Sequence, residues 1–428
     1  MLSTLVVLVP LASLASATVP GDGGTLTRIE SGASAKFGYY APLRLELVET
    51  PPESLTKPPA ALEAPLYGVI QPAGANGRVY HVILDEPDGK PARLFIDANG
   101  NGDCTDDAPA TWEGKPSPGH DGKEYTMHSG GGMLEFPAST TGDEGKAFNG
   151  HIAAYRFDKN DPAREQLKGV LLYYRDYGAE GEVTLQGKSY KAMLDDGQAT
   201  GDFSGRSQPP TDKAGDGPIR LLMDVNGNGK FDSRGESFDT SDPFNIGGTT
   251  WEVAVARDGL TLTATQSDKV VAEIPTPPDH STGKPILAFE ATDMDGNAVR
   301  FPSQYAGKVV LLDFWATWCG PCIKEMPHVV AAYEKFHDMG FEVLGVTLDS
   351  EDAAEKIRKT AGEKGMKWPQ IYDGGGWKAA IADKYAINSI PATFLVDGDT
   401  GLIIAVGRAL SGEGLAKEVE AALAKKKG

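Results

Sequence analysis

The clearest structural signal in the sequence is a strand-to-helix turn that carries two cysteines. The segment at residues 307–336 reads GKVVLLDFWATWCGPCIKEMPHVVAAYEKF, and its almost continuous apolar run at 309–314 is typical of a strand buried on both faces. After the cysteines, apolar residues recur at helical spacing, and Gly340 predicts the end of the helix. The sequence therefore places Cys319 at the amino-terminal end of a helix and Cys322 one turn further along.

This position changes the chemistry of the first cysteine. Unpaired backbone amides and the positive dipole end of a helix stabilise a thiolate, so they lower the pKa of the Cys319 thiol below its usual range. Cys322 is close enough to attack a mixed disulfide formed on Cys319 and to release a reduced substrate. A zinc site is the alternative, but zinc needs two further Cys or His ligands and the sequence holds no second Cys pair. We interpret the pair as a dithiol redox centre.

The residues around the cysteines resemble the active site of the thioredoxin superfamily. The motif WCGPC at 318–322 follows DFWA at 313–316. Within the superfamily the chain is most similar to the extracytoplasmic TlpA/ResA-like thiol-disulfide oxidoreductases, because Glu325 and Pro327 continue the motif as C-x-x-C-x-x-E-x-P and the hairpin sequence PILAFEATDMDGNAVRF precedes it. The resemblance covers about the last third of the chain. It implies an α/β thioredoxin-like fold for residues 286–428, with a central mixed sheet and flanking helices.

The resemblance also implies roles for individual residues. By position, Asp313 is the buried carboxylate that accepts the proton of the second cysteine, and burial raises the pKa of such a group into a useful range. Pro391 falls where the family has a cis-proline facing the active-site sulfurs, with the backbone of Ile390 pairing with substrate. The other residues implied for substrate contact or for the active-site cleft are Trp318, Gly320, Pro321 and Glu325. An exposed helix glutamate is also ordinary solvated surface, so Glu325 keeps both interpretations.

The resemblance implies thiol-disulfide exchange without a cofactor, through the disulfide of Cys319 and Cys322 alone. The implied partners are disulfide-bearing exported proteins, apocytochrome c among them, and a membrane thiol electron donor. The Gly-Pro dipeptide between the cysteines is that of reducing thioredoxin, which favours a protein-disulfide reductase. Two alternatives stay open: a thiol oxidant or isomerase of exported proteins, and an extracellular protein that binds calcium, glycan or a partner and carries an accessory thioredoxin domain. A peroxidase is disfavoured because the pattern P-x-x-x-T-x-x-C is absent around Cys319.

The first residues predict export. Residues 1–17, MLSTLVVLVPLASLASA, give an apolar run followed by the small residues Ala15-Ser16-Ala17, which is typical of a secretory signal peptide cleaved after Ala17. A buried first strand or a mis-assigned start is the alternative. No later stretch is long and apolar enough for a transmembrane helix. We therefore expect a secreted or periplasmic protein with no membrane span after cleavage.

The part before the thioredoxin-like region is expected to be rich in β-strands. The 52 Gly and 29 Pro favour short strands and tight turns, and a Pro-rich linker is predicted at 275–285. An internal echo, LFIDANGNGDCTDD at 94–107 and LLMDVNGNGKFDSRGE at 221–236, predicts two related modules at 18–150 and 151–274. The net charge of −19 disfavours nucleic acid as a partner.

Both copies of the echo place side-chain oxygens at positions one, three and five of a Gly-containing loop. That spacing is typical of calcium loops of the EF-hand type, and a plain hairpin turn is the alternative. Cys104, inside the first loop, is interpreted as an incidental small residue. The candidate ligands are Asp97, Asn99 and Asn101, completed by Asp106 or Asp107, in the first loop, and Asp224, Asn226 and Asn228, completed by Asp232 or Glu236, in the second.

Overall fold

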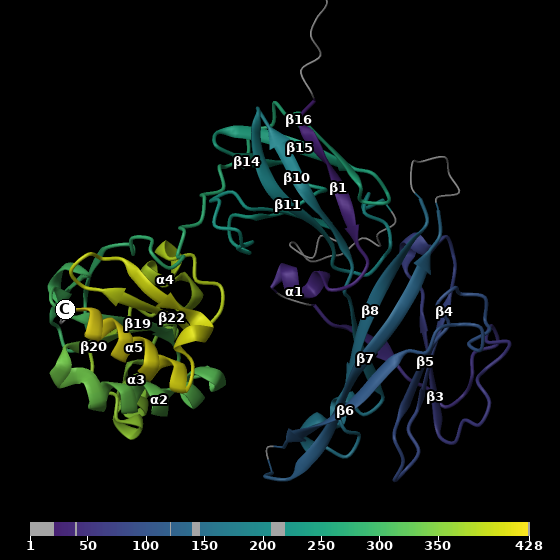
Figure 1. Ribbon diagram of the computed structural model, residues 1–428, viewed down its shortest axis with the longest axis horizontal. Helices are drawn as coiled ribbons and strands as arrows, with labels where there is room; N and C mark the ends of the chain where they lie inside the picture. Colours follow the sequence, from purple (N-terminus) through teal and green to yellow (C-terminus); the bar gives the residue numbers. More distant parts are fainter. Residues whose placement is uncertain (1–20, 39–40, 120, 139–145, 207–218, 427–428) are drawn as a thin grey trace, which may run out of the picture. The chain divides into compact units, whose positions relative to one another are not determined.

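The computed structural model describes residues 21–38, 41–119, 121–138, 146–206 and 219–426, so the predicted signal peptide at 1–17 lies outside the described residues. The described chain forms two compact units. The first comprises the residues up to Met223 together with Phe238–Glu273, and the second comprises Asp224–Ser237 together with the chain from Ile274 onward. Figure 1 shows the second unit largely in green to yellow.

The described residues of the first unit lie mainly in three β-sheets (Figure 1). One five-residue helix, α1 (Ala33–Phe37), accompanies them. The largest sheet has the order β13 (Ser237–Asp239), β12 (Ile219–Met223), β11 (Lys188–Asp196), β10 (Gly178–Leu185), β1 (Gly23–Ile29), β16 (Thr261–Gln266), β15 (Thr249–Val255) and β14 (Phe244–Ile246). The second sheet has the order β2 (Leu43–Glu46), β9 (Val170–Arg175), β8 (Phe148–Arg156), β7 (Glu124–Phe136) and β6 (Thr111–Pro118). The third sheet has the order β3 (Pro65–Ile70), β4 (Tyr80–Asp85) and β5 (Arg93–Ile96). The predicted richness in β-strands is confirmed.

The expectation of two separate related modules is not confirmed, because strands from both predicted modules share sheets. β1 pairs with β10 on one side and with β16 on the other, and β2 pairs with β9. β8 itself runs across the predicted boundary at 150/151. The division of this region into 18–150 and 151–274 stays a prediction.

The sequence echo nevertheless has a local structural counterpart. Each loop follows the second strand of an antiparallel pair, β4 with β5 and β11 with β12. The register is equivalent in the two pairs, since Val82 lies opposite Ile96 and Ala192 lies opposite Met223. These opposed residues occupy matching positions of the repeated sequence, so the likeness extends over a strand pair and its loop.

A buried ion pair ties two sheets of the first unit together. Arg156, in β8, is only 1% exposed and makes two hydrogen bonds to Glu86, at 2.8 and 3.0 Å. Its guanidinium also donates to the carbonyl oxygens of Val170 and Lys168. Glu86 directly follows β4, so the pair joins the sheet of β8 to the sheet of β4. A buried charge of this kind is tolerated only while its partner is present.

We predict that Glu86→Gln destabilises the first unit by about 3 kcal/mol, because the guanidinium of Arg156 then remains buried without a counter-charge. Urea denaturation followed by circular dichroism measures the free energy of unfolding. The matched control is Asp88→Asn, which removes the partner of Lys159 in an exposed ion pair and is expected to change stability by about 0.5 kcal/mol or less. Equal effects of the two substitutions would contradict the prediction.

The second unit is built around a mixed five-stranded sheet with the order β21 (Gln370–Ile371), β20 (Phe341–Thr347), β19 (Val309–Trp315), β22 (Ala392–Asp397) and β23 (Ile403–Val406). β19 runs parallel to β20 and antiparallel to β22, and all of its residues are buried. A small hairpin, β17 (Phe289–Thr292) with β18 (Ala298–Phe301), precedes the sheet. The predicted central mixed sheet is confirmed.

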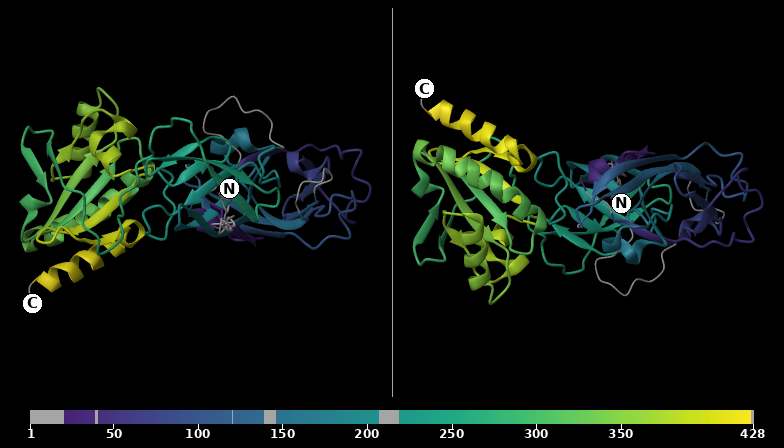
Figure 2. Two further views of the ribbon diagram at one scale, coloured as in Figure 1. Left: turned by 90° about the horizontal axis from the view of Figure 1, so that it is seen from above. Right: turned by 90° about the horizontal axis from the view of Figure 1, so that it is seen from below.

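Helices flank this sheet, as the resemblance implied. They are α2 (Gly320–Phe336), α3 (Ala354–Lys364), α4 (Ala380–Lys384) and α5 (Glu413–Lys426). α2 and α5 pack side by side, and Figure 2 shows the long α5 helix in yellow near the end of the chain. Within the described part of the chain, no helix combines the length and apolar character needed to cross a membrane.

Candidate active site

The two cysteines lie where the central strand gives way to a helix. β19 ends at Trp315, and Cys319 is the residue that caps the amino-terminal end of α2. Cys319 and Cys322 form a disulfide, and their residues are 4% and 2% exposed. The backbone N–H of Cys322 donates to Sγ of Cys319 at 3.2 Å. The same amide can stabilise negative charge on that sulfur after reduction, because it points at the position where a thiolate forms.

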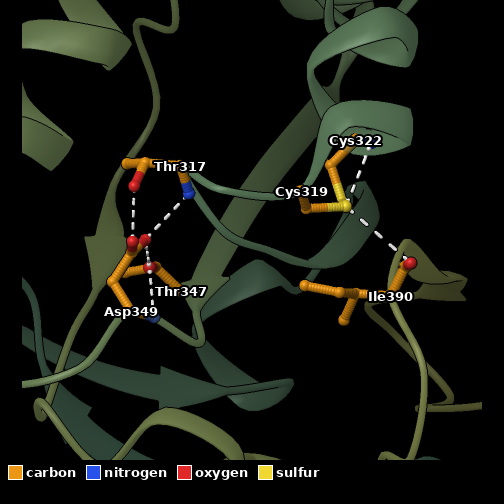
Figure 3. Close-up of a disulfide and its surroundings, with 6 residues drawn as sticks. All are labelled: Thr317, Cys319, Cys322, Thr347, Asp349 and Ile390. Carbon is orange, nitrogen blue, oxygen red and sulfur yellow. Dashed lines mark hydrogen bonds between the residues drawn. A yellow bond between two sulfur atoms is a disulfide. The ribbon is translucent and has the colours of Figure 1, made fainter. Parts of the chain in front are cut away.

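A second chain segment faces the disulfide from the other side. The peptide bond between Ile390 and Pro391 is cis. The carbonyl oxygen of Ile390 lies 3.8 Å from Sγ of Cys319, a contact drawn as a dashed line in Figure 3. A backbone carbonyl beside the sulfur can accept a hydrogen bond from an extended peptide that approaches the disulfide.

Asp313 is a buried residue of β19, six residues before Cys319. It is opposite Thr393 of β22, and burial raises the pKa of its carboxyl group to about 7. Asp313 and Cys322 line one cavity of about 260 Å³, together with Pro391. This arrangement gives the carboxyl group and the second cysteine a shared space in which water can carry a proton between them.

Glu325 lines the same cavity and also joins two helices. Its Oε2 atom accepts a hydrogen bond of 2.8 Å from the backbone N–H of Gly412, directly before α5. The side chain is therefore fixed at the cleft, in contact with the fold, and is more than a solvated surface charge.

An exposed aromatic pair borders the disulfide. Trp318, next to Cys319, is 48% exposed, and its ring centroid lies 5.8 Å from that of Trp377, which is 41% exposed. Gly320 and Pro321 open α2 without bulky polar groups. Sequence reasoning missed Trp377, although a tryptophan directly after three glycines at 374–376 is a recognisable signal of an aromatic side chain held on a loop.

Asp349 is a second residue that sequence reasoning missed. It follows β20 and is 2% exposed. Its carboxylate accepts hydrogen bonds from both the backbone N–H and the hydroxyl of Thr317, and from the hydroxyl of Thr347 (Figure 3). Thr317 lies two residues before Cys319, so Asp349 anchors the turn that delivers the cysteine to the helix end.

We predict that Asp349→Asn lowers the free energy of unfolding of the second unit by about 2 kcal/mol, because a neutral amide replaces a carboxylate that accepts several hydrogen bonds in a buried site. Urea unfolding of the oxidised protein measures the effect. Glu351→Gln, two residues along and exposed, is the control and is expected to be neutral. If both variants unfolded like the parent protein, Asp349 would not anchor the turn.

The two candidate calcium loops lie apart from the disulfide in sequence and differ in their contacts. In the first loop, Asp97 is engaged by the ring of His81 at 2.7 Å and by backbone amides. In the second loop, Asp224 accepts from Gly229 N–H, and Glu236 accepts from backbone amides of the same loop. Among the described residues, no group of three or more His, Cys, Asp or Glu side chains is placed to hold a metal ion.

Cys104 is buried and forms no disulfide. Burial raises the pKa of its thiol to about 12, with further contributions from the carboxylates of neighbouring aspartates. The thiol is therefore protonated at neutral pH and is a poor nucleophile. This matches the interpretation of Cys104 as an incidental small residue.

Comparison with known proteins links the second unit to thiol chemistry. Residues 282–405 match the AhpC/TSA family. The thiol-disulfide oxidoreductase ResA of Bacillus thuringiensis (strain Al Hakam) is 34% identical over 117 residues, which are 27% of this chain and 64% of that protein. The ResA of Geobacillus kaustophilus (strain HTA426) is 32% identical over the same length and coverage. The chain thus spans slightly less than two thirds of these relatives.

Solved structures show the same pattern of coverage. The thioredoxin domain of a thiol-disulfide oxidoreductase from Bacteroides vulgatus is 31% identical and covers 33% of this chain and 98% of its own, with a TM-score of 0.30. A thiol:disulfide interchange protein DsbE from Chlorobium tepidum is 28% identical over 34% of this chain, also with a TM-score of 0.30. The C-terminal third of the chain contains a thioredoxin-like domain that matches the AhpC/TSA family and is similar to thiol-disulfide oxidoreductases of the ResA kind.

Proposed function

We propose that the protein is an extracytoplasmic thiol-disulfide oxidoreductase that reduces disulfides of other proteins. One observation carries this proposal: the disulfide of Cys319 and Cys322 caps α2, with an amide donating to one face of the Cys319 sulfur and the Ile390 carbonyl lying against another. That geometry favours a thiolate on Cys319 and holds a backbone acceptor where a peptide substrate would lie.

The reaction proceeds by two exchanges. The thiolate of reduced Cys319 attacks one sulfur of the substrate disulfide, forms a mixed disulfide and releases the other substrate sulfur as a thiolate. Cys322 then loses its proton to the carboxylate of Asp313 and attacks the Cys319 sulfur, which releases the second substrate thiol. Two electrons pass to the substrate, and the protein is left with its own disulfide. A thiol donor reduces that disulfide again.

Substrate docking is assigned to the surface around the disulfide. The exposed rings of Trp318 and Trp377 supply apolar contact area for a polypeptide, and the carbonyl of Ile390 supplies a backbone acceptor. Gly320 and Pro321 leave the helix end open to an approaching sulfur. These features suit a protein substrate better than a small disulfide.

The partners follow from the predicted signal peptide and from the resemblance. We propose disulfide-bearing exported proteins as substrates, apocytochrome c among them, and a membrane thiol protein as the electron donor. The direction of exchange is set by the reduction potential of the cysteine pair. A reduction potential of about −270 mV, like that of thioredoxin, supports reduction. A potential above about −180 mV would assign the protein to oxidation or isomerisation.

We predict that Cys319→Ser abolishes the reduction of a disulfide-bonded protein substrate, because no other described thiol is placed to attack it. Cys322→Ser is expected to accumulate a covalent mixed disulfide with the substrate, visible on a non-reducing gel, because the resolving thiol is gone. Cys104→Ser is the matched control and retains full activity, since that thiol is buried with a raised pKa. Persistent turnover by Cys319→Ser would overturn the proposed mechanism.

We predict that Asp313→Asn makes the protein more stable at neutral pH but slower. The folded-state pKa of Asp313, about 7, lies above the ordinary value near 4. The contribution of Asp313 to the free energy of unfolding therefore falls as the pH rises from about 4 to 7 and is constant above that window. Asparagine does not titrate, so the stability of the variant relative to wild type grows across the same window. Resolution of the mixed disulfide slows by about 10²-fold without the proton acceptor.

Urea unfolding at pH 4.5 and at pH 7.5 measures the first effect, and stopped-flow release of the reduced substrate measures the second. Parallel pH dependence of stability in the variant and the parent would show that Asp313 keeps an ordinary pKa. A variant that resolves the mixed disulfide at the parental rate would remove Asp313 from the proposed proton transfer.

A further inference from the structure

The loop between β12 and β13 belongs to the second unit and contacts it through several side chains. Asn388, two residues before Ile390, donates through Nδ2 to Oγ of Ser233 at 2.6 Å. Arg234 donates to Asp383 of α4 at 3.0 Å. At the start of the loop, Asn226 donates to the carbonyl of Pro277 at 3.2 Å. The loop is therefore held against the chain that leads to the cis-proline.

Inside this loop, one carboxylate oxygen is buried without a partner. Asp224 is 6% exposed, and its Oδ2 atom accepts a hydrogen bond of 2.9 Å from Gly229 N–H. Its Oδ1 atom is buried and has no hydrogen-bond partner among the described residues. Leaving a buried carboxylate oxygen without a partner is unfavourable, and a bound cation would satisfy it.

The neighbouring side chains are oxygen donors of the kind that Ca²⁺ prefers. Asp232 supplies a further carboxylate at the ninth position counted from Asp224, and Glu236 accepts hydrogen bonds from loop amides. The amide oxygens of Asn226 and Asn228 complete the spacing of positions one, three, five and nine, counted from Asp224. A ligand set that relies on two amide oxygens needs no cluster of three carboxylates.

The first loop differs at its leading acid, Asp97, although one oxygen of Asp107 in that loop is also buried without a partner among the described residues. Both oxygens of Asp97 have partners: Oδ2 faces the ring nitrogen of His81 and Gly102 N–H, and Oδ1 accepts from Asn101 N–H. The other ring nitrogen of His81 contacts the hydroxyl of Ser54 at 2.8 Å. At the matching position of the second copy the residue is Lys191, and it makes no such contact in the described structure.

We propose that the loop at 224–236 binds one Ca²⁺ ion through oxygens of Asp224, Asn226, Asn228 and Asp232, and that the ion fixes one wall of the groove that the loop shares with Pro391. Glu236 orders the loop from within, since its carboxylate accepts hydrogen bonds from loop amides. The spacing suits a hard cation with oxygen ligands, for which Ca²⁺ tolerates an irregular site better than Mg²⁺ does.

The groove connects the loop to the cis-proline. It has a volume of about 240 Å³, and its walls include Asn228, Lys230 and Asp232 from the loop and Asn388 and Pro391 from the opposite side. Pro391 directly follows the carbonyl that contacts Cys319. We assign the groove to an extended polypeptide segment next to the target disulfide, an assignment that rests on the proposed function. Calcium therefore tunes the recognition of protein substrates, while the sulfur chemistry itself needs no metal.

Isothermal titration calorimetry of the full chain with CaCl₂, after removal of metal with EGTA, tests the site. We expect one site with a Kd of about 10⁻⁴ M, the range of extracellular calcium modules, and a rise in Tm of about 3–6 °C at 5 mM Ca²⁺. Asp224→Asn and the double variant Asn226→Ala/Asn228→Ala lose both effects. The matched control in the first loop, Asn99→Ala/Asn101→Ala, keeps them. Absence of binding, or loss in the first-loop control alone, would overturn the proposal.

Activity separates this inference from the proposed function. With a disulfide-bonded protein substrate, Ca²⁺ is expected to raise kcat/KM about threefold to tenfold over EGTA, whereas the rate with the small disulfide 5,5′-dithiobis(2-nitrobenzoate) stays unchanged. Equal rates with and without Ca²⁺ for the protein substrate would overturn the role of the ion at the groove. Calcium binding by a chain that reduces neither substrate would instead overturn the proposed function and leave the metal site standing.

Discussion

The chemistry of the second unit depends on one hydrogen bond, from the backbone N–H of Cys322 to the sulfur of Cys319. That bond exists because α2 begins directly after Cys319. The start of α2 is fixed in turn because β19, buried on both faces, holds the preceding chain at the carboxyl end of the central strand. Around it, the Ile390 carbonyl, the carboxyl group of Asp313 and the anchor of Asp349 each take a position relative to that sulfur. The contacts of the site thus converge on the Cys319 sulfur and on the turn that holds it.

Much of this arrangement was predictable from local sequence, and the rest was not. The apolar run at 309–314 and the Cys-Gly-Pro-Cys motif predict a strand, a turn and a helix because all of the causes lie within thirty neighbouring residues. The role of Asp349 could not be predicted from the sequence, because Asp349 follows a different strand and contacts Thr317 only in the folded chain. Trp377 is a candidate site residue because its ring lies against that of Trp318, and this contact between distant parts of the chain cannot be inferred from the sequence.

The repeated Asp-x-Asn-Gly-Asn-Gly loops show how far a motif can specify its chemistry. Both loops follow equivalent strand pairs, and in both the backbone N–H of the second glycine donates to the carboxylate of the first acid. Their first acids differ in what surrounds them: His81 faces Asp97, while one oxygen of Asp224 has no partner in the described part of the chain. The sequence alone offers both loops as candidate calcium sites. The distinction comes from one residue on a neighbouring strand.

The place of β1 in the largest sheet bears on the order in which the chain can fold. Gly24 lies opposite Leu262, and Leu26 lies opposite Gly181, so this early strand sits between two strands synthesised much later. While the chain emerges amino terminus first, β1 has no partner on either edge until those segments are present, and its exposed edges are open to wrong pairings throughout that time. The largest sheet of the first unit can therefore close only after β16, close to the end of that unit, is available.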